Sequence, residues 1–418
     1  MSRASDPRKP SLTPAFALFG ARIVYAFNWY NVGAVLGLIG TSLDANAAQL
    51  GIVLGAFLAG VGIFQVPAGV LALRWGSRRT ALTGLLVMGI AGVACAFSTQ
   101  ILDLILLRFL AGVGAAFFFS PALSLVASYF PPGKRGPVIG LYNGGFSLGG
   151  AIGVTVGAAI GLRFGWQFAL GLGGTALLVM VLYNWLVLPR ESALQPTPDR
   201  SQVFRAVWGV VRSRSIWALS LAFTGFWAAM YIVAQDFVLF ASKVHPTWGT
   251  QTAADIATVF ILMSFPGGPL GGWLAERGWD RRWVLVIFAV GDGVLVASIP
   301  FVGLYLSAGL FVIMGLFDGI VFAVLYLIPS YLPETQGQGL ALGIAAMNSI
   351  QVLLGSGIAI AFGYIAVLAG FTTAWIFVGV LTLVSIPLVL LVAPNRAGTP
   401  LPAVSGDSGT GAEPLTSK

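Results

Sequence analysis

The sequence predicts an all-α membrane protein with twelve transmembrane helices in two halves of six. Of its 418 residues, 57% are hydrophobic and only 9% are charged, whereas soluble proteins average about 25% charged residues. A bilayer core of about 30 Å requires about 20 apolar residues per helix, and apolar runs of that length recur twelve times. The 55 glycines follow no collagen-like period and suit close helix packing in lipid.

Charged residues and Pro- or Gly-rich breaks separate the predicted spans. In order, the spans cover residues 14–40, 47–73, 80–98, 102–129, 136–161, 167–188, 215–241, 254–275, 283–304, 306–331, 337–366 and 371–393. The segment 189–214 is the longest internal polar stretch, so we expect it to be a cytoplasmic linker between halves at 14–188 and 215–393. We expect residues 1–13 to form a cytoplasmic N-terminal segment and residues 394–418 a disordered cytoplasmic tail.

The basic residues predict the orientation in the membrane. Outside the spans, only Arg163 and Lys243 fall on the side opposite the N-terminus. The positive-inside rule therefore places both termini in the cytoplasm of a multi-pass cell-membrane protein. The net charge of +8 then reflects topology, with the lipid bilayer and no nucleic acid as partner. The eighteen residues on the N-terminal side are Arg3, Arg8, Lys9, Arg74, Arg78, Arg79, Lys134, Arg135, Arg190, Arg200, Arg205, Arg212, Arg214, Arg277, Arg281, Arg282, Arg396 and Lys418.

The two halves contain a repeated loop. With an offset of 203 residues, the stretch after the second span matches the stretch after the eighth. Two six-span halves with matched loops are typical of transporters built from parallel repeats. The matched residues are Gly69, Leu71, Ala72, Arg74, Arg78 and Arg79 in the first half, and Gly272, Leu274, Ala275, Arg277, Arg281 and Arg282 in the second.

These motifs resemble the major facilitator superfamily. The repeated loop resembles that family's signature G-x-L-a-D-r-x-G-r-r, and Arg108, Gly112 and Gly114 match its second motif, R-x-x-x-G-x-G. The resemblance implies a secondary transporter whose halves rock around a midplane site. It also implies a conformational-gating role for Gly69, Arg74, Gly76, Arg78, Arg79, Gly272, Glu276, Arg277 and Arg281.

The sequence departs from the family pattern at two places. Leu73 replaces the usual Asp of the first-half signature, whereas Glu276 keeps an acid in the second half. The family's drug/proton antiporters carry a Gly-Pro pair in the fifth span, and this chain has Gly149-Gly150. The second departure argues against a drug exporter.

Five charged residues lie inside the predicted spans: Arg22, Arg108, Asp236, Asp292 and Asp318. A charge at the bilayer centre costs about 2.5 to 3.5 kcal/mol on insertion scales, so each is a candidate functional residue. The alternatives are snorkelling for Arg22, bracing of backbone carbonyls for Arg108, and a solvated mouth position for Asp236. Asp318 and Asp236 are candidate proton-coupling residues, and we expect Asp292 to make a helix–helix contact.

The charges differ in sign between the halves. Both arginines lie in the first half and the acids in the second. Two arginines in one cavity favour an anionic substrate, because a guanidinium binds a carboxylate through two hydrogen bonds and stays charged. Arg22 in the first span and Arg108 in the fourth are similar to the organic-anion branch of the superfamily, the anion:cation symporters. Acids of that branch are replaced here by Ala21 and Ala115.

Neutral polar residues complete a candidate substrate pocket. Each of them alone could instead make an interhelical hydrogen bond. Phe117, Phe118 and Phe119 are expected only to pack. The pocket candidates are Asn28, Tyr30, Asn31, Tyr142, Asn143, Tyr326, Asn348 and Gln351, with Gln65 nearby in the second span.

The motifs that are missing argue against an enzyme. The sequence has no G-x-x-x-x-G-K-[ST] loop for ATP, and His245 and Cys95 stand alone, so we expect no metal, no cofactor and no catalytic residue. The predicted function is secondary active transport of a small solute, an organic anion, by a monomer, with a proton as candidate coupling ion. Two alternatives remain open: a proton-coupled exporter of drugs or other apolar or cationic compounds, and a non-transporting receptor or scaffold.

Overall fold

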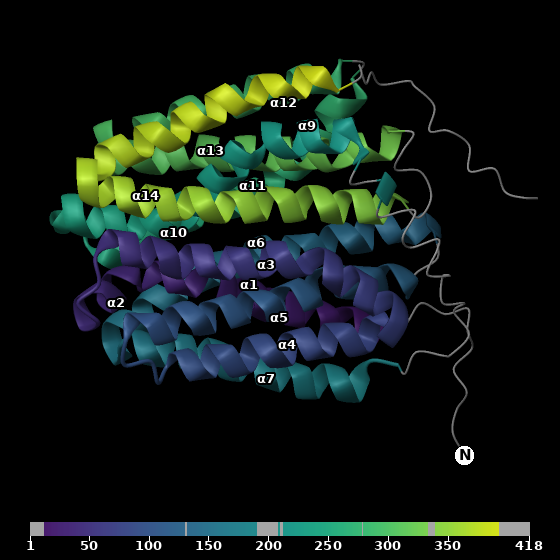
Figure 1. Ribbon diagram of the computed structural model, residues 1–418, viewed down its shortest axis with the longest axis horizontal. Coiled ribbons are helices and arrows are strands. Elements are labelled where there is room, and N and C mark those ends of the chain that lie inside the picture. The colour runs from purple at the N-terminus through teal and green to yellow at the C-terminus, as the bar shows by residue number, and fades with distance from the viewer. Residues whose placement is uncertain are drawn as a thin grey trace, which may run out of the picture.

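The computed structural model describes residues 12–129, 132–189, 208–209, 212–277, 279–332 and 339–392. The expected tail 394–418, nearly all of the 1–13 segment and most of the 189–214 linker lie outside these residues. Within the described ranges every regular element is a helix (Figure 1).

The first half forms six spans from seven helices. The first span bends by 53° between α1 and α2. A capping box between Asn46 and Gln49 starts the second, because each side chain accepts from the other residue's backbone N–H at 3.0 Å. The helices are α1 (Leu12–Ala34), α2 (Leu36–Ser42), α3 (Ala47–Trp75), α4 (Ser77–Cys95), α5 (Ile101–Ser128), α6 (Pro132–Phe164) and α7 (Trp166–Val187).

The second half also forms six spans. α9 and α10 together make one span from Arg214 to Val244. α14 holds two, because its backbone leaves the helical region at Gly370, where φ is 84°. The twelve predicted spans are therefore confirmed. The helices are α9 (Arg214–Ala222), α10 (Thr224–Val244), η1 (Pro246–Trp248), α11 (Thr250–Glu276), α12 (Arg281–Ser298), η2 (Ile299–Phe301), α13 (Leu304–Leu327), η3 (Ile328–Tyr331), α14 (Gly339–Ser385) and η5 (Ile386–Leu391).

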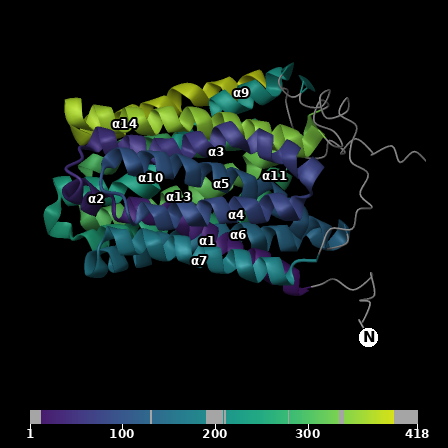
Figure 2. The ribbon, with the colours of Figure 1, turned by 60° about the horizontal axis from the view of Figure 1, so that its bottom comes forward.

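The helices α1 to α7 lie in the lower part of Figure 1 and α9 to α14 in the upper part, and α3 lies beside α14 in both views (Figures 1 and 2). The two halves meet where α3 packs on α14, α6 on α11 and α1 on α10. We call the end where α3 passes into α4 and α11 into α12 the basic end, and the other, marked by α2 in Figure 1, the opposite end. Contacts between α3 and α14 run from Gly51 and Gly363 at the opposite end to Gln65 and Asn348 nearer the basic end.

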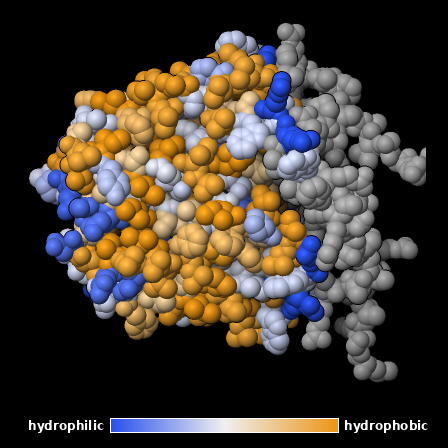
Figure 3. All heavy atoms as spheres, viewed as in Figure 1, coloured by the Kyte–Doolittle hydropathy of each residue, from blue (hydrophilic) through white to orange (hydrophobic). Residues whose placement is uncertain are grey.

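On the face shown in Figure 3, apolar surface covers the middle of the bundle and hydrophilic residues lie towards its two ends. Large apolar side chains such as Leu106, Leu182 and Val384 are exposed in the described part of the chain. A soluble protein rarely exposes so much contiguous apolar surface, so the chain is a multi-pass membrane protein.

Glycines permit the close helix packing that the composition predicts. A Cβ at Gly112 of α5 would lie 2.0 Å from the Phe57 carbonyl oxygen of α3, so only glycine admits this approach. Other glycines make no such contact, because a Cβ at Gly69 or Gly272 would meet no heavy atom within 4 Å.

Candidate functional site

All five in-span charged residues are buried. Their exposed fractions lie between 3% and 5%, so Arg22 does not snorkel and Asp236 does not sit at a solvated mouth. In the described part of the chain no ion pair joins one of these arginines to one of these acids. Neither arginine is therefore neutralised by the nearby acids, which is costly in a low-dielectric interior.

Arg108 presents one edge of its guanidinium group without a partner. Its Nη1 donates to the Asn28 carbonyl oxygen at 3.3 Å, and the Phe57 ring centroid lies 4.2 Å from its Cζ. The buried Nε and Nη2 atoms have no hydrogen-bond partner. These two nitrogens share one edge of the planar guanidinium, the geometry that holds a carboxylate through two parallel hydrogen bonds.

Tyr231 brings the other half of the protein to this edge. It lies on α10, and its buried hydroxyl lies close to the Arg108 guanidinium. Trp227 stacks on its ring at 6.0 Å between centroids, which fixes the ring plane. Arg108 and Tyr231 thus bring buried polar groups from opposite halves together.

Arg22 lies at a different level of the bundle. The rings of Tyr25, Phe119, Tyr142 and Phe146 surround its Cζ at 4.5 to 5.3 Å, and its Nε and Nη1 have no partner. Asn28, which contacts Arg108, is six residues further along α1, or about 9 Å at 1.5 Å per residue.

This separation changes the predicted anion site. The sequence predicted that the two arginines share one cavity. Both side chains do lie in the interior of the first half, but they lie at different levels. The Asn28 carbonyl oxygen, to which Arg108 donates, lies about two helical turns along α1 from Arg22. One carboxylate therefore cannot bind both guanidinium groups. Phe119, expected only to pack, is part of the ring box around Arg22.

Two of the three acids inside the spans, Asp318 and Asp292, form a second cluster. Ser264 donates to Asp318 Oδ2 at 2.6 Å, and Asp318 Oδ1 has no partner. Asp292 and Tyr30 lie within electrostatic range of Asp318. Asp236 is buried elsewhere, with Oδ2 unpartnered.

Several of the predicted neutral pocket residues make structural hydrogen bonds. Asn28 Nδ2 donates to the Gly173 carbonyl at 2.9 Å and Asn31 Nδ2 to the Ala169 carbonyl at 3.4 Å. Gln351 is fully buried with both amide atoms unpartnered. Asn143 is exposed, and Tyr142 is drawn into the ring box with its hydroxyl unpartnered.

A polar chain links the halves near the basic end. The Tyr326 hydroxyl donates to Asn348 Oδ1 at 2.7 Å, and Asn348 Nδ2 donates to Gln65 Oε1 at 2.9 Å. It connects α13 and α14 of the second half with α3 of the first.

A second tie between the halves was missed from the sequence. The Gly33 N–H donates to Gln235 Oε1 at 2.8 Å, and Gln235 Nε2 donates to the Trp29 carbonyl. In an uninterrupted helix residues 29 and 33 pair with each other, so the carboxamide bridges one i to i+4 pair of α1 just before its bend. A Cβ at Gly33 would lie 2.6 Å from the Gln235 Cα, so glycine is required for this approach. The rule that selected the neutral polar residues of the pocket would also have found Gln235, a polar residue in an apolar run.

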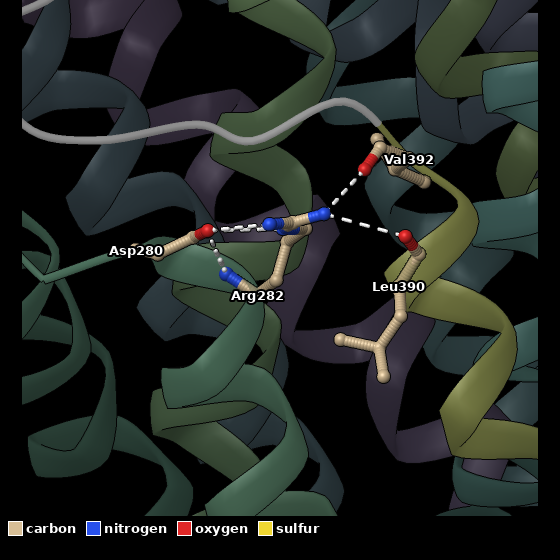
Figure 4. A network of polar contacts seen from close by, with 4 residues as sticks. All are labelled: Asp280, Arg282, Leu390 and Val392. Carbon is tan, nitrogen blue, oxygen red and sulfur yellow. Dashed lines mark hydrogen bonds and ion pairs between the residues drawn. The ribbon is translucent and has the colours of Figure 1, made fainter.

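The repeated gating loop differs in length between the halves: α4 begins two residues after the end of α3, whereas α12 begins at Arg281, five residues after α11 ends at Glu276. Gly76 has φ of 89° and separates α3 from α4. Arg74, Arg79 and Arg277 are exposed. Arg281, which the sequence match pairs with Arg78, is buried, and Arg282, whose contacts Figure 4 shows, is the second residue of α12 as Arg78 is the second residue of α4. The side chain of Glu276 lies outside the described residues.

Two six-helix halves with a buried polar site between them define a membrane transporter. The chain belongs to the Major Facilitator Superfamily, whose model matches residues 18–253 and 238–415. It is therefore a transporter and not an enzyme.

Individual relatives are distant. The nitrite extrusion protein of Bacillus subtilis (strain 168) is 25% identical over 317 residues, which cover 74% of this chain and 77% of that protein. The gallate transporter of Pseudomonas putida is 24% identical over 311 residues, which cover 66% and 69%. The crystal structure of a bacterial homolog of the human lysosomal transporter Spinster, inward-facing and occupied, shares the fold, with a TM-score of 0.73 at 17% identity over 90% of this chain and 96% of that one.

Proposed function

We propose that this protein carries a small organic anion across the cell membrane by alternating access, and that the anion binds at Arg108. The observation that carries the proposal is the buried Nε and Nη2 edge of Arg108, which has no partner among the described residues. A carboxylate there would supply two charge-assisted hydrogen bonds and the missing counter-charge.

The position of Tyr231 explains how binding is coupled to movement of the halves. The Arg108 edge belongs to the first half and the Tyr231 hydroxyl to the second, so an anion held by both favours a state in which the halves are close. The ring of Phe57 supports the guanidinium plane. A lysine would keep the charge but lose the planar fork.

The names of two relatives support an anionic substrate. The nitrite extrusion protein and the gallate transporter are named for solutes that are anions at neutral pH. They differ in size and shape, so they support the charge of the substrate and not its identity.

We infer that the basic end faces the cytoplasm, with both termini on that side, because arginines gather there. Gln235 ties α1 to α10 towards the opposite end, and the Tyr326–Asn348–Gln65 chain ties the halves nearer the basic end. We expect a monomer to suffice, because the Arg108 site lies within one chain.

Asp318 is our candidate for the coupling proton. It accepts one hydrogen bond, from Ser264, and lies within electrostatic range of a second acid, Asp292, which disfavours two negative charges together. Pairing with Arg22 or Arg108, the alternative role for this acid, is not found in the described residues. Asp236 is the next candidate.

The proposal is tested by ligand stabilisation of the purified protein. It is heated with a panel of carboxylates that includes gallate, with nitrite, and with the neutral methyl ester of each carboxylate. A ligand present at 100 times its Kd stabilises the folded state by about 2.7 kcal/mol, so a binding anion raises the melting temperature and its ester does not. Stabilisation by apolar amines and by no anion would instead favour the exporter of cationic compounds, with Asp236 and Asp318 as its cation sites.

A further inference from the structure

The span formed by α9 and α10 is interrupted inside the membrane. Phe223 separates the two helices and lies about 13 Å along the axis from Arg214, where the span begins. Phe223 is fully buried, and it provides no side-chain cap for α10. The positive end of a 21-residue helix is therefore buried in the second half without a capping side chain.

Side-chain hydroxyls take the carbonyl groups at this interruption. Thr224 Oγ1 donates to the Ser220 carbonyl oxygen at 2.7 Å, and Ser385 Oγ donates to the Ala222 carbonyl oxygen at 2.9 Å. In an uninterrupted helix these two carbonyls would accept from the N–H groups of Thr224 and Phe226. Neither N–H group donates to another group in the described part of the chain, so the start of α10 keeps two unused donors.

The side chain of Gln351 on α14 lacks partners at the same place. It is fully buried, and neither its Nε2 nor its Oε1 has a hydrogen-bond partner among the described residues. One turn after it, Gly355 packs on α10, where a Cβ would lie 3.0 Å from Trp227 Cε3. One turn before it, Met347 belongs to the same buried cluster as Phe223. Gln351 therefore lies against the interruption, because residues four apart share one face of a helix.

One hydroxyl group would satisfy both features. A buried amide without hydrogen bonds is destabilising, and so is a backbone N–H without an acceptor inside a membrane. A hydroxyl placed between them accepts from the N–H and donates to Gln351 Oε1. A second carboxylate is disfavoured there, because the in-span charged residues of this half are the acids Asp236, Asp292 and Asp318.

We propose that Gln351 and the start of α10 bind a hydroxyl group of the transported anion. The carboxylate binds at Arg108, and the apolar middle of the molecule lies along the Trp227 ring, which stacks on Tyr231. Tyr231 lies two turns of α10 beyond Phe223, or about 12 Å along the axis. The substrate is therefore a carboxylate whose hydroxyl is remote from its carboxyl group. This inference rests on the proposed anion site at Arg108.

The test measures binding by thermal stabilisation of the purified full-length protein, with pairs of acids that differ only in a hydroxyl group. The remote pairs are 4-hydroxybenzoate with benzoate and 6-hydroxyhexanoate with hexanoate, and the near pair is lactate with propionate. The hydroxylated member of each remote pair should bind the wild type about 5- to 150-fold more tightly, the effect of two buried hydrogen bonds. Lactate should gain nothing over propionate, because its hydroxyl adjoins the carboxyl group.

Gln351→Met keeps the length of the side chain and removes the amide. This variant should bind benzoate and hexanoate as the wild type does, and it should lose the preference for their hydroxylated partners. Without ligand its melting temperature should not fall, because no hydrogen bond of the described residues is lost.

Asn184→Leu is the matched control for the amide. Asn184 is as fully buried as Gln351, but its Nδ2 donates to the Ala17 and Met180 carbonyl oxygens at 3.2 and 2.9 Å. The control should therefore lower the melting temperature of the ligand-free protein and keep the preference for the hydroxylated acids.

The hydroxyl site is overturned if the wild type binds both members of each remote pair equally, if the lactate pair shows the same preference, or if Gln351→Met keeps the preference. It is also overturned if Gln351→Met lowers the ligand-free melting temperature as Asn184→Leu does, because the carboxamide would then be a packing contact of α14. If no carboxylate stabilises the wild type at all, the anion site at Arg108 fails and the hydroxyl site fails with it, so the two failures are distinguishable.

Discussion

Replacing Gln235 by leucine should weaken the tie that holds the two halves together towards the opposite end. The carboxamide makes two hydrogen bonds to backbone atoms of α1, at Gly33 and Trp29. Buried hydrogen bonds of this kind contribute about 0.5 to 1.5 kcal/mol each. Losing both removes about 1 to 3 kcal/mol from the closed state, a shift of about 5- to 150-fold in the ratio of closed to open protein.

The assay for this shift is the labelling rate of a cysteine placed between the halves. Ser242 of α10 faces Gly37 of α2, where a Cβ at Gly37 would lie 3.3 Å from the Ser242 hydroxyl. Ser242→Cys is introduced into a Cys95→Ala background and reacted with an impermeant maleimide. The rate should rise at least about fivefold when Gln235→Leu is added, because the halves separate more often.

Gln251→Leu is the matched control for the labelling experiment. Gln251 also bridges the halves, through its Nε2 and the Thr155 carbonyl at 3.3 Å, but this contact is only partly buried. Water replaces such a bond at little cost, so the labelling rate should change by less than about twofold. An unchanged rate in Gln235→Leu, or an equal rise in both variants, would refute the assigned role of Gln235.

Three further predictions concern packing, coupling and topology. Gly112→Ala should lower the free energy of unfolding by about 1 to 3 kcal/mol through overpacking. Gly69→Ala should not lower it, because Gly69 has open space beside it. Equal melting temperatures of the two variants would contradict the close approach of the helices at Gly112. Asp318→Asn should still exchange substrate in proteoliposomes but fail to concentrate it, and normal concentrative uptake would remove Asp318 as the coupling residue. In the cysteine-free background, a cysteine at Arg163 should be labelled from outside intact cells and one at Arg200 only from inside; outside labelling at 200 would overturn the orientation.

The spans and the candidate charges were predictable because they depend on local sequence. Apolar runs of membrane length predict helices whatever their neighbours are, and a charge in such a run stands out by itself. Arg108, Asp318 and Asp292 were predicted in this way, each from its position along one span.

The relations between spans were not predictable from a single sequence. The sequence places Arg22 and Arg108 in the first and fourth spans, but it does not say at which depth each side chain lies, so the two-level arrangement came only with the structure. Tyr231 was missed because a tyrosine in an apolar span is ordinarily a packing residue. The offset of 203 residues pairs Arg78 with Arg281 in sequence, but the two residues take different positions in their helices, because α4 begins at Ser77 and α12 begins at Arg281.

The most direct test of the central claim is substrate counterflow in proteoliposomes. The anion that stabilises the wild type is preloaded, and entry of its labelled form is followed for the wild type, Arg108→Lys, Arg108→Gln and the exposed control Arg163→Gln. We predict rapid counterflow for the wild type and the control, and loss of most of it in both Arg108 variants, because neither side chain offers the guanidinium edge. Counterflow at the wild-type rate by Arg108→Gln would show that no guanidinium is needed there, and would contradict the account.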